Sequence, residues 1–201
     1  MLFPTFLKLG GRQVLLVGGG VVAAGKLRGL LEAGAVVKVV APRILPDIAS
    51  APVETAMRPF EPADLDGVSF VVAAAPAEVN RQVAAAAQAR GIFVNAVDDV
   101  ESASAYAGAV LRRAGVTIAI STDGDAPALA GLVREALEML LPEDLDDWMA
   151  CAQEARRQWL AQRVPMAERR PLLLAALNAL YAQRAAARTS DASTVAGAAV
   201  L

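Results

Sequence analysis

The sequence predicts an α/β fold built on a doubly wound parallel sheet. Short apolar segments alternate with helical patterns from Gly11 to about Asp99, and strands that alternate with helices form parallel sheets. A glycine-rich turn joins the first strand to the first helix, as is typical of this class of sheet. After Asp99 the pattern changes to one further strand and a series of helices.

Four short apolar segments are predicted as strands of the sheet, and the last three are rich in Val or Ile. They cover residues 14–17, 36–40, 68–73 and 92–97. Helices are predicted between them over 23–33 and 80–90. Each helix is followed by a glycine, Gly34 or Gly91, which is the preferred residue beyond a helix C-terminus.

The second half of the chain predicts a strand over 116–120 and then a helix with a wide apolar stripe. The stripe consists of Leu129, Leu132, Val133, Ala136, Leu137 and Leu140. It either packs on its own domain or contacts a second subunit, and the pattern alone favours neither. Asp125 is predicted to cap the start of this helix. Two more helices are predicted over 145–163 and 167–184, and the Ala-, Ser- and Thr-rich residues 185–201 are expected to be mobile.

Composition limits the classes of function. Of the 201 residues, 56% are hydrophobic and 20% are charged, so the chain can bury a large core. Cys151 is the only cysteine and histidine is absent. These counts exclude an intramolecular disulfide and a thiol-rich metal site, and they leave Asp or Glu as the expected general base.

Charge and hydropathy also bear on the partners of the chain. A net charge of −2 gives no reason to expect nucleic acid as a partner. No apolar run reaches the roughly 20 residues that span a bilayer, and the N-terminus lacks the layout of a secretory signal. We therefore expect no membrane association and a cytoplasmic location.

The glycine turn has the G-x-G-x-x-A form of a dinucleotide-binding turn. Gly18 is predicted to adopt the backbone angles of a tight turn and Gly20 to leave room for a pyrophosphate. Ala23 is predicted to let the helix approach the strand closely. The phosphates would then meet the amides of the helix N-terminus. The alternative is a glycine turn that only joins a strand to a helix.

Several motifs in a fixed order resemble the siroheme synthase amino-terminal family over about residues 1–184. They are GGGxVAxxK from Gly18, VVAP from Val39, EVN from Glu78, NAVDD from Asn95, and TIAIST from Thr117 with GxxPALA from Gly124. Members of that family are precorrin-2 dehydrogenases, and some are also sirohydrochlorin ferrochelatases. The resemblance implies a homodimer with a Rossmann-like NAD domain (1–111), a dimerisation region (112–144) and a helical C-terminal domain (145–184).

The resemblance also implies a reaction in which a hydride and a proton leave precorrin-2, giving sirohydrochlorin and NADH. The family's catalytic aspartate falls on Asp98, and its cofactor contacts fall on Val21, Val22, Pro42 and Arg43. From the residues themselves, Asp98 follows a predicted strand, so it is expected at the carboxyl edge of the sheet, where ligands of such folds bind. The alternative is an aspartate that only forms a turn.

The choice of cofactor has two candidates. Enzymes that bind NAD usually carry an acid after the second strand, whereas this chain has Pro42 and Arg43 there. Arg43 would suit the 2′-phosphate of NADP. Relatives with the same VVAP segment use NAD, so we expect NAD first and NADP second.

The substrate carries many carboxylates, and arginine is a suitable partner for them. Arg112, Arg113 and Arg134 are the candidates, unless they only form a solvated surface. No resident metal is predicted. Fe²⁺ enters only as a substrate, in the alternative that the protein also inserts iron into sirohydrochlorin. A further alternative is a dinucleotide- or tetrapyrrole-binding module without turnover.

Overall fold

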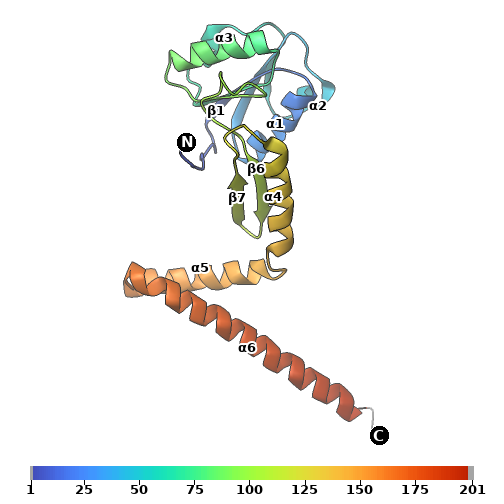
Figure 1. Ribbon diagram of the computed structural model, residues 1–201, viewed down its shortest axis with the longest axis vertical. Coiled ribbons are helices and arrows are strands. Elements are labelled where there is room, and N and C mark those ends of the chain that lie inside the picture. The colour runs from blue at the N-terminus through green and yellow to red at the C-terminus, as the bar shows by residue number, and fades with distance from the viewer. Residues whose placement is uncertain (1, 199–201) are drawn as a thin grey trace. The chain divides into compact units, whose positions relative to one another are not determined.

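The computed structural model describes residues 2–198, and side chains through Gln183. Two compact units are present (Figure 1). The first unit consists of the residues up to Ala109 together with Ile120–Gly131. The second consists of Val110–Ala119 together with the residues from Leu132 onward.

A five-stranded parallel sheet forms the centre of the first unit. The strands are β1 (Gln13–Val17), β2 (Val36–Val40), β3 (Glu54–Ala56), β4 (Phe70–Ala73) and β5 (Val94–Ala96), in the order β3-β2-β1-β4-β5. Every pair of neighbours is parallel. This is the Rossmann order, in which ligands bind beyond the carboxyl ends of the strands, where the order reverses between β1 and β4. The predicted fold class is confirmed.

Helices cover both faces of this sheet (Figure 1). They are α1 (Val21–Glu32), α2 (Pro46–Ala49), the 3-10 helix η1 (Pro62–Leu65) and α3 (Ala77–Gln88). On one face, Leu27 of α1 packs in a buried cluster with Leu16 of β1. On the other face, Val83 of α3 packs in a second cluster with Leu15 of β1. Alternate residues of β1 therefore serve the two cores, as expected of a strand buried on both faces.

A buried carboxylate ties η1 to β2. Both oxygens of Asp64 accept hydrogen bonds from Arg58, at 2.8 and 2.6 Å, and the Lys38 amine of β2 lies 3.3 Å away. The amide of Glu61 donates a further hydrogen bond of 3.0 Å. The hydrogen bonds from Arg58 are the main reason that the pKa of Asp64 is lowered from 3.8 to about 2. The carboxylate is thus ionised and paired at neutral pH.

The chain beyond the main sheet forms β6 (Ala109–Arg113), β7 (Val116–Ile120), α4 (Pro127–Leu140), α5 (Leu145–Gln162) and α6 (Met166–Ala198). β6 and β7 make a two-stranded sheet. Ala114 and Gly115 join them with left-handed φ values of 49° and 78°, as in a tight hairpin turn. Within the second unit, the indole N–H of Trp148 on α5 donates to the Tyr181 hydroxyl of α6 at 2.7 Å. None of the helices in residues 2–198 is long and apolar enough to cross a bilayer.

Two features of this half differ from the prediction. β6 was not predicted, because it has only three apolar residues and ends in two arginines. α6 continues to Ala198, whereas the sequence predicted a helix only as far as Arg184. Alanine is the strongest helix former, which explains the extension through this Ala-rich segment. Residues 199–201 lie outside the described residues, and the mobility expected of 185–201 stays a prediction.

Candidate functional site

In the glycine turn after β1, the space at Gly18 and at Gly19 excludes any side chain. Gly18 has a φ of 127°, and a Cβ added there would lie 2.3 Å from the carbonyl oxygen of Ala74. A Cβ on Gly19 would lie 2.0 Å from the carbonyl oxygen of Arg43. Both contacts are with backbone, so neither position accepts another residue without a shift of the chain. The turn is therefore wedged between the loops that follow β4 and β2.

Gly20 is different, because a Cβ added there would meet no atom of the protein within 4 Å. Its backbone, with φ −92° and ψ −169°, is open to any residue. The fold itself therefore does not require a glycine at this position. A ligand that approaches the main chain at Gly20 would require one.

The first turn of α1 has the properties of an anion site. Gly20 is the N-cap and offers no side chain to the helix amides, and the first turn holds no acidic residue. Val21 and Val22 are 80% and 51% exposed, whereas Ala23 is fully buried against the sheet. The first amides of a helix lack partners within the helix and carry a partial positive charge. The residues present therefore fit the pyrophosphate of a dinucleotide.

The loop after β2 completes this part of the site. Pro42 and Arg43 are exposed, and the amide of Leu45 donates to the carbonyl oxygen of Gly19 at 2.9 Å. Together with the contact between Gly19 and Arg43, this bond places the loop directly beside the glycine turn. The structure thus brings the predicted cofactor residues together, from Gly18 to Ala23 and at Pro42 and Arg43.

Asp98 lies just past the carboxyl end of β5, in a turn with a left-handed φ of 56°. This backbone conformation is uncommon outside glycine, although Asp and Asn adopt it more readily than other residues. The side chain is exposed. In the part of the chain that the structure describes, its carboxylate has no hydrogen-bond or ion-pair partner. It is available to a ligand.

The neighbouring Asp99 is already engaged. Its Oδ1 accepts a hydrogen bond of 3.1 Å from the amide of Ser102. Hydrogen bonds from Ser102 are the main reason that the pKa of Asp99 is lowered. A carboxylate held in its ionised form by such bonds is a weaker base. Of the two adjacent aspartates, Asp99 is therefore the one whose carboxylate the loop already uses, whereas the Asp98 carboxylate has no partner among the described residues.

Short-range bonds close the loop that carries both aspartates. Where β5 begins, the amide of Val94 donates to Ser104 Oγ, and its carbonyl accepts from the Ser104 amide, each at 2.9 Å. Farther along, the Tyr106 hydroxyl donates to the carbonyl of Val100 at 3.0 Å. These bonds give the loop a defined shape without engaging Asp98.

One buried polar residue near this loop was not predicted as part of the site. Asn80, in the first turns of α3, is only 2% exposed. Its Oδ1 accepts from the amide of Ala75 at 3.0 Å, and its Nδ2 donates to the carbonyl of Val97 at 3.3 Å. It therefore bridges the loops after β4 and β5. In the sequence, Asn80 stood out only as a member of the EVN motif. Its bridging role could not be predicted, because its partner Val97 is 17 residues away.

The three predicted substrate arginines lie in the second unit. Arg134 is paired on its own helix, at 2.7 Å from Glu138. Arg113 donates to the carbonyl of Leu141 at 3.4 Å. Arg112 is exposed and has no partner among the described residues. Their role toward a substrate stays a prediction, for which Arg112 is the most available.

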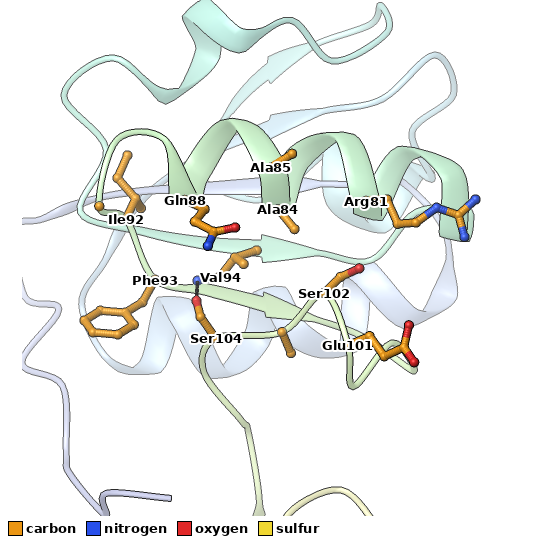
Figure 2. Close-up of a pocket in the computed structure, with 12 residues that line it drawn as sticks. Arg81, Ala84, Ala85, Gln88, Ile92, Phe93, Val94, Glu101, Ser102 and Ser104 are labelled. Carbon is orange, nitrogen blue, oxygen red and sulfur yellow. Dashed lines mark hydrogen bonds between the residues drawn. The ribbon is translucent and has the colours of Figure 1, made fainter.

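A groove of about 600 Å³ lies at the β5 edge of the sheet (Figure 2). α3 contributes Arg81, Ala84 and Gln88 to it, and the segment after Asp99 contributes Glu101 and Ser104. None of the predicted site residues lines it. The groove is thus separate from the glycine turn and Asp98. Among the residues described, no group of three or more Cys, Asp and Glu side chains is arranged to hold a metal ion.

A family model and two curated proteins are similar to this chain. The family model described as putative NAD(P)-binding matches residues 5–109. Siroheme synthase of Chromobacterium violaceum is 46% identical over 145 residues, which are 70% of this chain and 31% of that protein. Siroheme synthase 1 of Aeromonas salmonicida is 42% identical over 195 residues, which are 94% of this chain and 42% of that protein. The chain spans less than half the length of these two relatives.

Among solved structures, "SirC, precorrin-2 dehydrogenase" is 27% identical, with a TM-score of 0.66. The match covers 86% of this chain and 88% of that chain. It therefore extends beyond the glycine turn and the sheet into the second half of the chain.

Proposed function

Because this chain belongs to the family of putative NAD(P)-binding proteins, we propose that it oxidises precorrin-2 to sirohydrochlorin with NAD as the hydride acceptor. The observation that carries the proposal is the exposed, unpaired carboxylate of Asp98 at the carboxyl edge of the sheet that also holds the glycine turn. The similarity to a precorrin-2 dehydrogenase over most of the chain supports the choice of substrate.

The glycine turn and the start of α1 hold the dinucleotide. The open space at Gly20 would admit the pyrophosphate, and the amides of Val21 and Val22 would supply hydrogen-bond donors to it. Gly18 and Gly19 keep the turn wedged against Ala74 and Arg43, so that these amides keep their direction. Bound NAD supplies the hydride acceptor of the reaction.

Asp98 accepts the proton that leaves precorrin-2 as the hydride departs. The substrate loses one hydride and one proton, and the products are sirohydrochlorin and NADH, with the proton on a carboxylate oxygen of Asp98. No neighbouring side chain occupies these oxygens among the described residues, so the group is free to approach the substrate. Asp99 keeps its bond to Ser102 and shapes the turn.

NAD is the preferred cofactor and NADP the second candidate. The loop after β2 presents Pro42 and the exposed Arg43, and a guanidinium beside the ribose also suits a 2′-phosphate. Equilibrium titration with both cofactors tests the preference. Tighter binding of NADP would contradict it.

A homodimer in the cytoplasm is the assembly that we propose. The apolar stripe of α4 is not covered within the single chain, since Leu129 and Leu132 are 53% and 63% exposed and Leu140 is 77% exposed. A contiguous exposed apolar face marks an interaction surface, and a second copy of the same chain is the most common partner in symmetric assemblies.

The direct test is anaerobic turnover of the purified protein with precorrin-2 and NAD. NADH and sirohydrochlorin are expected to appear in equal amounts. Binding of NAD without turnover would contradict the proposal and favour a non-catalytic binding module. A second incubation with sirohydrochlorin and Fe²⁺, compared with the uncatalysed rate, tests the alternative of iron insertion.

A further inference from the structure

We infer that Asn80 is a positioning residue that fixes Asp98 relative to the glycine turn. The inference rests on the proposed function, since it assigns to Asn80 the placement of the proposed proton acceptor. It concerns a side chain that lies on α3 rather than on the loop itself. Asn80 therefore acts on Asp98 through the backbone.

The bridge made by Asn80 joins the two loops that matter for the reaction. Its Nδ2 donates to the carbonyl of Val97, the residue directly before Asp98. Its Oδ1 accepts from the amide of Ala75, next to the Ala74 carbonyl against which Gly18 is wedged. A continuous series of contacts thus runs from the glycine turn to the turn that carries Asp98.

The position of Asp98 depends on its backbone more than that of most residues. Its carboxylate has no partner among the described residues, so no side-chain contact holds it. Its φ of 56° lies in the left-handed region, which is strained for a residue with a side chain. A turn of this kind persists when its surroundings restrain it, and the bond to the Val97 carbonyl is a restraint immediately before it.

An asparagine amide is suited to this bridge because it presents a donor and an acceptor at a fixed separation. Both partners are backbone groups, and Asn80 is 2% exposed, so water replaces neither bond easily. Aspartate has nearly the same shape and still accepts from Ala75, but it cannot donate to Val97 in its ionised form. Asn80→Asp therefore removes the bond to Val97, keeps the bond from Ala75, and places a carboxylate oxygen against the Val97 carbonyl.

The test compares Asn80→Asp with Ser104→Ala in turnover, NAD affinity and thermal unfolding. Ser104 also accepts a hydrogen bond from backbone that closes this loop, at Val94 rather than beside Asp98, so its loss is the matched structural control. We expect kcat to fall at least about 10-fold in Asn80→Asp, with the Kd for NAD changed less than about 2-fold. Ser104→Ala is expected to keep kcat within about 2-fold of the wild type. Asn80→Ser, whose hydroxyl is too short to reach both partners, is the second variant if Asn80→Asp does not fold.

A double-variant comparison separates this inference from the proposed function. If Asn80 acts through Asp98, adding Asn80→Asp to Asp98→Asn lowers kcat no further, because residues that act as a unit are not additive. The inference would be overturned if the loss of kcat in the double variant equalled the product of the two single losses. It would also be overturned if Asn80→Asp and Ser104→Ala had equal kcat values. Full activity of Asp98→Asn alone would instead overturn the role of Asp98.

Discussion

Replacing Gly18 and Gly20 separately by alanine should separate the fold of the glycine turn from its ligand. At Gly18 the new Cβ meets the Ala74 carbonyl at 2.3 Å, whereas ordinary contacts begin at 3.4 Å, so the two loops must part by about 1 Å. The φ of 127° adds backbone strain. Strain and overpacking each cost about 1–3 kcal/mol, so Gly18→Ala is expected to lose about 2–6 kcal/mol of stability.

Gly20→Ala should leave the stability of the free protein within about 0.5 kcal/mol of the wild type. The backbone conformation there suits alanine, and the added Cβ meets no protein atom within 4 Å. Alanine stabilises the protein by lowering the conformational entropy of the unfolded chain and destabilises it as a poorer N-cap residue, and these two contributions roughly cancel. Its methyl group does enter the space assigned to the pyrophosphate. We therefore expect the Kd for NAD to rise at least about 10-fold, or about 1.4 kcal/mol.

Urea unfolding and equilibrium titration with NAD measure the two effects on the same preparations. The reasoning would be refuted if Gly20→Ala bound NAD as tightly as the wild type. It would also be refuted if Gly20→Ala destabilised the free protein as much as Gly18→Ala does.

Three further predictions concern stability and assembly. The folded pKa of Asp64, about 2, lies below its ordinary 3.8, so its pairing with Arg58 contributes about 2 kcal/mol to stability above pH 4, and this contribution is lost as the pH falls toward 2. Asp64→Asn should therefore be less stable at pH 7 and should lose less stability than the wild type as the pH falls from 4 to 2. An equal loss of stability in the variant and the wild type over that range would contradict this. Tyr181→Phe removes the acceptor of the Trp148 indole N–H and should cost up to about 1 kcal/mol in guanidinium unfolding, whereas no change would show that the bond contributes nothing. Leu132→Asp on the exposed stripe of α4 should convert a dimer into a monomer in sedimentation experiments, and a dimer that persists would exclude this face.

The central sheet was predictable from the sequence because its strands carry strong local signals. Residues 36–40 are valine at every position except Lys38, as favoured in a strand of a parallel sheet, and the predicted bounds of β2 agree with the structure. β3 was not predicted, since the strand has only the three residues Glu54–Ala56, two of which are polar, and it pairs along only one edge. Likewise α2 and η1 are single turns held by tertiary contacts rather than by a periodic pattern.

The family was also predictable, and the similarity to siroheme synthases confirms the resemblance carried by the ordered motifs. The glycine turn is a local feature, so the turn conformation of Gly18 followed from its spacing, whereas the space for a pyrophosphate at Gly20 stays a prediction. The predicted N-cap role of Asp125 is wrong in detail, because α4 begins at Pro127 and Thr122 Oγ1 accepts from the Ala126 amide instead.

Other parts of the site depend on contacts between distant residues. Position 19 must be glycine because any Cβ there would collide with the carbonyl of Arg43, which lies on the loop after β2. Asn80 is matched to Ala75 and Val97 from two different loops. The contrast between Asp98 and Asp99 arises from the bond to Ser102. Each of these pairings is a property of the folded chain and has no periodic trace in the sequence.

The rates of hydride transfer in Asp98→Asn and Asp99→Asn, measured in a single turnover with precorrin-2 and NAD, test the central claim most directly. The two residues are adjacent and of the same type, so each variant is the control for the other. A general base contributes about 10²–10⁴-fold to a rate. We therefore expect Asp98→Asn to lose at least about 100-fold while Asp99→Asn stays within about 5-fold of the wild type. A large loss in Asp99→Asn with Asp98→Asn still active would contradict the account.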